Sequence, residues 1–269
     1  MPSVSRQILH FALQRMNRDE ILHLHGTERR ILERPGFKHE ITPFVSRNVS
    51  FNPAWRSSIT WAHCDPDGAD EMVAFEREYF ESLGRVFEWK VYGYDWPPNL
   101  LDALSAHKFG IGPEAAFMVM DTHERGRDWD PTRYLDIRLV QDAQGVRDFV
   151  AVEHAVWDES EAERWNSLMN NAPEYVSLYV AYHQGQPVSC ARANFHPSSQ
   201  FCSLWGGATL PQFRGMGFYL ALVAARVDEA RQRGVRFVSI DAAPTSRPIL
   251  EKRGFEFVDW VRVCRPEEG

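Results

Sequence analysis

The chain has 269 residues, of which 44% are apolar and 25% are charged, and its formal net charge is −7 at pH 7. This length and apolar content suffice for one large or two modest globular domains with a hydrophobic core. A negative balance argues against general nucleic-acid binding, which needs clustered Lys and Arg. No apolar run approaches the ~18 residues of a membrane helix, and the N-terminal stretch contains His10, Gln14 and Arg15, unlike a signal peptide. We therefore expect a cytoplasmic protein with neither a nucleic-acid nor a membrane partner.

The cysteines and the acidic segments indicate no metal site. Four cysteines are widely separated and form no Cys-x-x-Cys pair, so we expect buried, reduced thiols. Residues 64–70 read Cys-Asp-Pro-Asp-Gly-Ala-Asp, but they lack the later ligands of a calcium loop. A turn whose Asp caps the following helix is the favoured interpretation.

The N-terminal part begins with residues 1–37, which read as a polar, helical extension. In residues 38–125, apolar spacing predicts a helix over 71–83, a strand over 86–92, a short helix over 99–108 and a strand over 115–120. Residues 125–131 are polar and rich in turn formers, so we expect a linker there.

The C-terminal part alternates strands and helices. We expect strands at 134–140, 176–182, 187–195, 201–210 and 235–241, and helices at 146–157, 159–170 and from about Gly217 to Gly234. Gly185 favours a hairpin turn. Gly206 and Gly207 lie inside an expected strand, which is typical of a bulge or a close backbone approach, with or without a ligand.

The segment between the 201–210 strand and the following helix has the properties of a phosphate-binding loop. It reads Leu210-Pro211-Gln212-Phe213-Arg214-Gly215-Met216-Gly217-Phe218-Tyr219-Leu220. A helix that starts near Gly217 directs unpaired backbone N–H groups and its positive dipole end toward an anion. The glycine spacing alone would favour an ordinary strand-to-helix turn.

These residues resemble the acetyl-CoA loop of the GNAT superfamily of N-acyltransferases, whose pattern is Arg/Gln-x-x-Gly-x-Gly/Ala. Arg214 and Gly217 match, whereas Tyr219 occupies the last small position; a register on Gln212 fits the letters but places the helix start less well. The Gly-Phe pair at 254–255 is similar to the end of the family's closing helix. The resemblance covers residues 133–265. It implies an α/β GNAT fold, a mixed, mostly antiparallel twisted sheet flanked by helices.

Residues 71–120 repeat the element order of residues 220–263: helix, glycine, strand, proline loop, short helix, Phe/Gly pair, strand. We therefore expect a tandem, with a degenerate GNAT-like domain over 38–125 before the acetyl-CoA-binding domain over 133–265. The first copy has carboxylates at 65–70 where its loop should bind, and these would repel a pyrophosphate. One coenzyme site is expected.

The resemblance implies transfer of an acetyl group from acetyl-CoA, the co-substrate, to an amine of a small molecule or protein, without a metal. The implied coenzyme contacts are Gly207, Ala208, Thr209, Arg214, Gly215, Met216, Gly217, Phe218, Tyr219 and Leu220. The alternative is a non-catalytic acyl-CoA-binding or interaction protein. Neither the acceptor nor the oligomeric state follows from these residues.

Acyl transfer to an amine requires removal of a proton from the ammonium and departure of the thiolate. Glu153 and His154 are the candidate bases, and they lie in an acid-rich helical run. The alternative interpretation of this run is a solvated helix face without a catalytic role. Leu250 stands where the family usually has a Tyr acid, and Ala243 where it usually has an Asn. Ser246 or Tyr219 is then a substitute donor, unless water protonates the thiolate.

Overall fold

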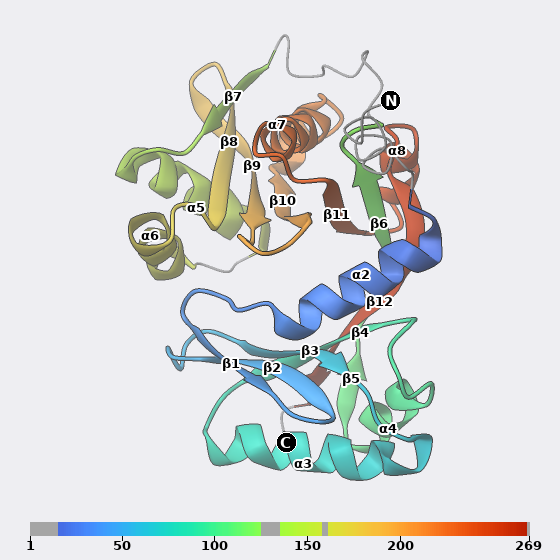
Figure 1. Ribbon diagram of the computed structural model, residues 1–269. Coiled ribbons are helices and arrows are strands. Elements are labelled where there is room, and N and C mark those ends of the chain that lie inside the picture. Colours follow the sequence, from blue (N-terminus) through green and yellow to red (C-terminus); the bar gives the residue numbers. More distant parts are fainter. Residues whose placement is uncertain (1–15, 125–134, 158–160, 268–269) are drawn as a thin grey trace, which may run out of the picture.

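The computed structural model describes residues 16–124, 135–157 and 161–267. The chain folds into a mixed α/β structure in which helices flank a twisted, mostly antiparallel sheet, as predicted (Figure 1). The strands are β1 (Phe37–Ile41), β2 (Val45–Ser50), β3 (Ser57–Ala62), β4 (Phe87–Tyr92), β5 (Phe109–Ile111), β6 (Ala115–Asp121), β7 (Asp136–Leu139), β8 (Val176–His183), β9 (Gln186–Phe195), β10 (Phe201–Thr209), β11 (Phe237–Ala242) and β12 (Glu256–Pro266).

The helices follow the apolar spacing of the sequence. They are α2 (Arg18–Ile31), α3 (Ala69–Ser82), α4 (Leu100–Ala106), α5 (Ala143–Trp157), α6 (Ala162–Asn171), α7 (Phe218–Gln232) and α8 (Arg247–Glu251), with short 3-10 turns η1 (Pro66–Gly68) and η3 (Pro211–Phe213). An Asn17 capping box starts α2. The predicted helical extension over 1–37 is helical only from Arg18 to Ile31 among its described residues, and Phe37 already begins β1. The expected linker at 125–131 lies outside the described residues.

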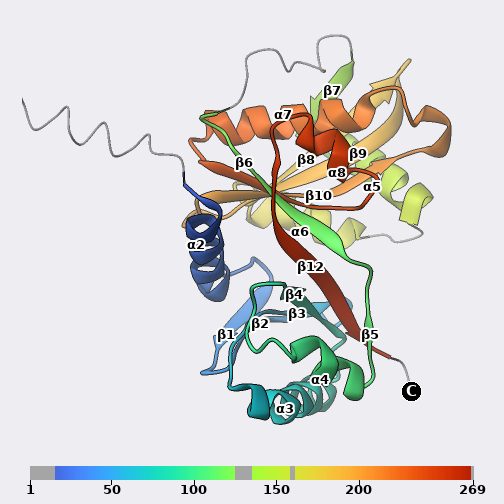
Figure 2. The same ribbon diagram turned by 90° about the vertical axis from the view of Figure 1, so that its right-hand side faces the viewer.

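The strands join in the order β1-β2-β3-β4-β12-β6-β11-β10-β9-β8-β7, and β5 pairs with β12. We call residues 16–124 the first half and residues 135–267 the second half. Each half contributes a strand to the other, because β6 pairs with β11 while the end of β12 pairs with β4. Figure 2 shows β12 running from one lobe into the other. The two halves therefore share one continuous sheet.

The two halves repeat one order of elements. In the first half β3, η1, α3, β4 and α4 follow one another, and in the second half β10, η3, α7, β11 and α8 do the same. In each copy the two strands that flank the long helix pair in parallel. This repetition agrees with the tandem inferred from the sequence. The division between residues 125 and 133 stays a prediction, since β6 and β12 cross between the halves.

Alternating burial along the strands gives the second half a core on each face of the sheet. Leu204, Val223 and Val238 belong to the core beneath α7. Phe149 and Trp165 lie in the core beneath α5 and α6. All four cysteines are buried and free, as expected. The sheet thereby fixes α7 on one side of β10 and β11 and leaves room on the other side.

Candidate active site

Strands β10 and β11 begin as neighbours and then separate. Their parallel pairing runs from Phe201–Phe237 to Leu204–Ile240 and ends there. On its other edge β10 shifts register against β9 between Trp205 and Ala208, which is the bulge expected from the two glycines. Gly206 has φ +63°, and a Cβ there would lie 2.5 Å from Nη1 of Arg192. Glycine is therefore needed for the bulge.

The glycine loop (residues 214–217) leads into the first turn of α7. Gly215 and Gly217 have φ of +77° and +91°, and Gly217 is the N-cap residue of α7. No side chain caps this helix, and its first turn contains no acid. The backbone N–H groups of the first turn are therefore available to an anion, and exposed Arg214 stands beside them.

The side chains around α7's start have different environments. Met216 is exposed, whereas the ring of Phe218 is buried among residues of β8 and α7, so only its backbone can face a ligand. Ala208 is buried, and its carbonyl accepts a hydrogen bond from Ser189 Oγ at 2.6 Å. The hydroxyls of Thr209 and Ser189 are 2.7 Å apart. The end of β10 is thereby fixed next to the loop.

Tyr219 and Ser246 meet beside the bulge. A Cβ on Gly207 would lie 3.4 Å from the Tyr219 ring, so the two residues are already in contact distance. Burial raises the pKa of Tyr219, and a hydrogen bond with Ser246 acts in the opposite direction. The Tyr219 hydroxyl therefore keeps its proton at neutral pH, and the Ser246 hydroxyl donates to the Ala243 carbonyl at 3.0 Å. Leu250 is fully buried in the core beneath α7.

The two predicted bases lie on different sides of α5. Glu153 is buried, accepts a hydrogen bond from Trp165 Nε1 at 2.8 Å and lies 3.7 Å from Nη1 of Arg192. Burial raises the pKa of Glu153 although these partners act against it. His154 is exposed on the same helix. Neither residue lines the cavity described next, and the structure does not bring them together with Tyr219.

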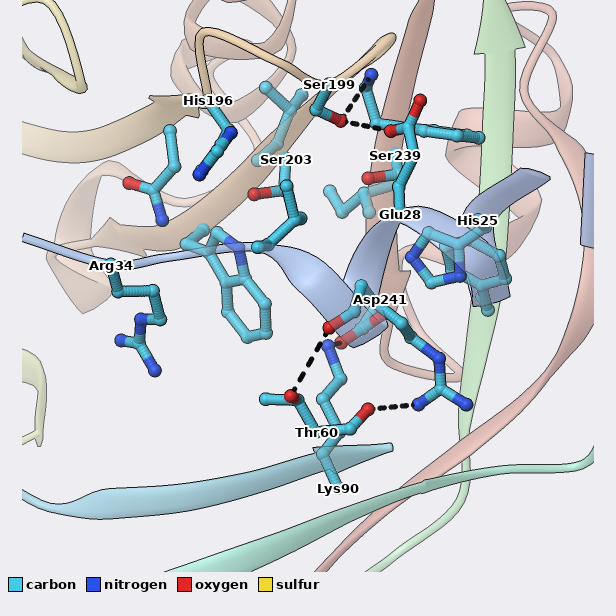
Figure 3. Close-up of a pocket in the computed structure, with 18 of the residues that line it drawn as sticks. His25, Glu28, Arg34, Thr60, Lys90, His196, Ser199, Ser203, Ser239 and Asp241 are labelled. Carbon is cyan, nitrogen blue, oxygen red and sulfur yellow. Dashed lines mark hydrogen bonds and ion pairs between the residues drawn. The ribbon is translucent and has the colours of Figure 1, made fainter. Parts of the chain in front are cut away.

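A cavity of about 170 Å³ lies between the two halves (Figure 3). Ser203 and Ser239 line it, whereas Cys202 and Val238 before them belong to the core beneath α7, so the cavity is on the opposite face of the sheet. α2 and strands β2, β3 and β4 form its first-half wall, and β9, β10 and β11 form its second-half wall. Its polar lining comprises His25, Glu28, Arg29, Arg34, Asn48, Thr60, Lys90, Tyr92, Tyr175, Asn194, His196, Ser199, Ser203, Ser239 and Asp241.

An ion pair joins the halves where β10 and β11 diverge. Lys90 Nζ lies 2.6 Å from Asp241 Oδ2 and 4.2 Å from the centre of the Trp205 ring. Both charged side chains are largely buried, with 15% and 16% exposure. Asp241 directly follows the last β11 residue paired with β10, and Lys90 directly follows Trp89, the last β4 residue paired with β3. The two residues thus hold equivalent positions in the repeat.

Sequence reasoning missed both members of this pair. Asp241 has a local signal, because it lies at the carboxyl end of a parallel strand next to the bulged one. Lys90 has none, since only the long-range pairing of β4 with β12 brings it to the second half. Within the described ranges, no group of three His, Cys, Asp or Glu side chains is arranged to hold a metal. Likewise, no helix in the part that the structure covers is long and apolar enough to cross a bilayer.

Comparison with known proteins agrees with this geometry. Residues 143–255, which run from the start of α5 to the end of the α8 turn, match the family described as acetyltransferase (GNAT) family. No curated protein matches the chain.

Solved structures share the fold over both halves. A GCN5-related N-acetyltransferase from Kribbella flavida is similar with a TM-score of 0.69 and 15% identity over 87% of this chain and 91% of that one. A GCN5-related N-acetyltransferase from Sphaerobacter thermophilus has a TM-score of 0.62 and 14% identity, and the match covers 83% of this chain and 78% of that one. A tandem GNAT protein from the clavulanic acid biosynthesis pathway has a TM-score of 0.56 and 13% identity, and the match covers 88% of this chain and 85% of that one. Residues 143–255 of this chain therefore match an acetyltransferase domain of the GNAT family, and the chain shares the fold of solved GNAT structures over both halves.

Proposed function

We propose that this protein transfers an acetyl group from acetyl-CoA to an amine held in the cavity between the halves. The observation that carries the proposal is the divergence of β10 from β11, which lies between the glycine loop on one side and Asp241 on the other. A coenzyme whose phosphates bind at the start of α7 can extend between the two strands toward Trp205. Its thioester would then reach the wall of the cavity.

Several features support coenzyme binding at the loop. The first turn of α7 is uncapped and free of acids, and Gly217 brings no side chain between the helix start and an approaching phosphate. Gly206 and Gly207 are unpaired with β9 because of the bulge. Their backbone groups can therefore bond to the pantetheine chain and to the acetyl oxygen, in the manner of an added strand.

The reaction requires one proton to leave the ammonium before nitrogen attacks the acetyl carbon. The Asp241 carboxylate can hold the ammonium and accept that proton, directly or through water, while Lys90 positions it. As the C–N bond forms, the C–S bond breaks, the sulfur leaves as thiolate and the nitrogen releases its second proton to water. Water, Tyr219 or Ser246 can then protonate the thiolate, so no single acid is essential.

Amine-dependent thiol release from acetyl-CoA, measured across a panel of amines, tests this proposal. We expect Asp241→Asn to lower kcat by ~10²–10⁴, as loss of a general base typically does, with acetyl-CoA affinity unchanged. Asp136→Asn removes an exposed acid on β7 and serves as the matched control.

Glu153→Gln and His154→Gln decide whether the base is on α5 instead. A hundredfold loss in either variant, with Asp241→Asn near wild type, would assign the base to α5. Coenzyme binding without release in the presence of any amine would favour the alternative, a non-catalytic acyl-CoA-binding protein.

A further inference from the structure

The cavity wall opposite the Lys90–Asp241 pair carries an arginine without a carboxylate partner. Figure 3 shows Arg34 on one side of the cavity, with Asp241 and Lys90 toward the other. Its Nη1 donates to Ser58 Oγ at 3.2 Å, its guanidinium lies 4.5 Å from the centre of the Phe37 ring, and it hydrogen-bonds with Tyr175. Among the residues that the structure describes, no carboxylate lies within ion-pair distance of Arg34. Burial lowers the pKa of Arg34.

The neighbouring charges do not pair with Arg34. Glu88 favours the charge on Arg34 but pairs with Arg265 at 3.0 Å. The charge of Arg164 lowers the pKa of Arg34. The charges of Arg164 and Arg34 both lower the pKa of Arg192. Arg164 pairs with Glu161 at 2.6 Å, and Arg192 has Glu153 at 3.7 Å. These two arginines are therefore neutralised locally, whereas Arg34 is not. Arg34 is only partly buried, and a bound anion that accepts its charge-assisted hydrogen bonds would stabilise the guanidinium there.

The other groups on this wall are neutral and polar. They can donate or accept hydrogen bonds around an anion and comprise Asn48, Tyr175, Asn194 and His196. A guanidinium binds a carboxylate through two parallel N–H donors, which gives orientation as well as affinity. The opposite side offers the Asp241 carboxylate, which pairs with Lys90 at 2.6 Å and can accept a second hydrogen bond from an ammonium.

We infer that the acceptor is a small amino-acid-like molecule whose carboxylate binds Arg34 while its amine lies at Asp241. This inference rests on the proposed acetyl transfer and specifies its substrate class. The volume of about 170 Å³ suits a molecule of that size. Arg34 comes from the segment after α2, so the first half determines the acceptor and the second half binds the coenzyme.

The test compares acceptors that differ only in the carboxylate. The α-amino acids, β-alanine and 4-aminobutanoate are each assayed beside the corresponding carboxamide. The carboxylates are expected to have at least about tenfold higher kcat/KM, the usual value of a charge-assisted hydrogen bond. Arg34→Gln should raise KM for the carboxylates by about tenfold or more and abolish the preference, with kcat within a few-fold of wild type. Arg34→Lys should restore part of the preference, because it keeps the charge.

A matched control is Arg30→Gln on α2, which removes an arginine stacked on Trp61 at 4.4 Å, outside the cavity. This variant should keep the carboxylate preference, and both variants should bind acetyl-CoA like wild type. Equal use of acids and amides by wild type, or an unchanged preference in Arg34→Gln, would overturn the inference while leaving acetyl transfer intact.

Binding of reaction products gives a second readout that needs no turnover. N-acetylated amino acids should raise the melting temperature of wild type more than their amides do, and Arg34→Gln should remove the difference. If no amine is acetylated, the proposed function is wrong. If acids and amides also raise the melting temperature equally, the carboxylate inference is wrong as well.

Discussion

The two halves start their long helices in different ways, although both follow a bulged or shifted β-strand and a 3-10 turn. α7 begins at Gly217, with positive φ and no acid in its first turn. α3 begins at Gly68, whose φ of −91° is ordinary, and places Asp70 and Glu71 in its first turn. Asp65 makes no cap hydrogen bond, so the predicted Asp cap was wrong. One architecture is thus suited to an anion only at α7, where acids are absent and glycines with positive φ turn the chain.

The halves also use a buried arginine differently. In the first half, Arg47 donates to both oxygens of Glu76, at 3.0 and 2.8 Å, and to Glu40 at 2.7 Å. In the second half, buried Arg226 on α7 donates to backbone carbonyls of Leu222, Arg192 and Trp205 at 2.9, 2.9 and 3.3 Å. The first arrangement holds a helix on a sheet, while the second ties α7 to β9 and β10 where the bulge begins.

The largest expected effect is on the first half. Arg47→Met leaves Glu76 and Glu40 without their shared cation, and breaking such a buried pair costs ~3–5 kcal/mol of the free energy of unfolding. Denaturant unfolding measures this. Arg265→Met, which removes an exposed pair with Glu88, is the control and should cost ~1 kcal/mol or less. Equal effects in the two variants would show that the network contributes no more than a surface pair.

The same network predicts a pH dependence. Burial would raise the pKa of Glu40, but hydrogen bonds from Lys38, Tyr79 and Arg47 outweigh it and lower the pKa to about 2. A depressed carboxyl pKa stabilises the folded state above the unfolded pKa of 4.5, and this contribution is lost as pH falls from 4.5 toward 2. Glu40→Gln should therefore flatten the acid limb of the unfolding midpoint. An unchanged limb would contradict the shift.

A smaller effect is expected in the second half. Arg226→Met removes a buried donor from three backbone carbonyls, at a cost of ~1–3 kcal/mol, and it should weaken acetyl-CoA binding by relaxing the bulge. Arg231→Met, on the same helix but exposed, is the matched control. Calorimetry separates the outcomes: loss of stability with normal coenzyme affinity would mean that Arg226 does not position the bulge.

The smallest effects concern the thiol end of the site. Tyr219→Phe and Ser246→Ala should each lower kcat by less than about tenfold, because a thiol is a tolerable leaving group with water as its acid. Single-turnover thiol release measures this. A hundredfold loss in one variant, with unchanged coenzyme affinity, would identify that hydroxyl as the general acid.

Local patterns predicted the element types, since α7, the β8–β9 hairpin and the β10 bulge each have a signal within a few residues. The exchange of β6 and β12 has no such signal, because strand partners far apart in sequence are set by packing of the whole sheet. For the same reason Arg34, Lys90 and Asp241, which meet only across the halves, were not predicted as a group. Glu153 was predicted from charge alone, and charge does not say that Trp165 and Arg192 surround it.

Titration of acetyl-CoA into the protein tests the central claim most directly. We expect one coenzyme per chain and, at 100 times the dissociation constant, a stabilisation of ~2.7 kcal/mol. Gly217→Asp should abolish both, because its carboxylate would face the phosphates. Gly84→Asp, at a positive-φ position with open space at the end of α3, imposes similar backbone strain and should bind normally. Two equivalent sites, or unchanged affinity in a folded Gly217→Asp protein, would contradict the account.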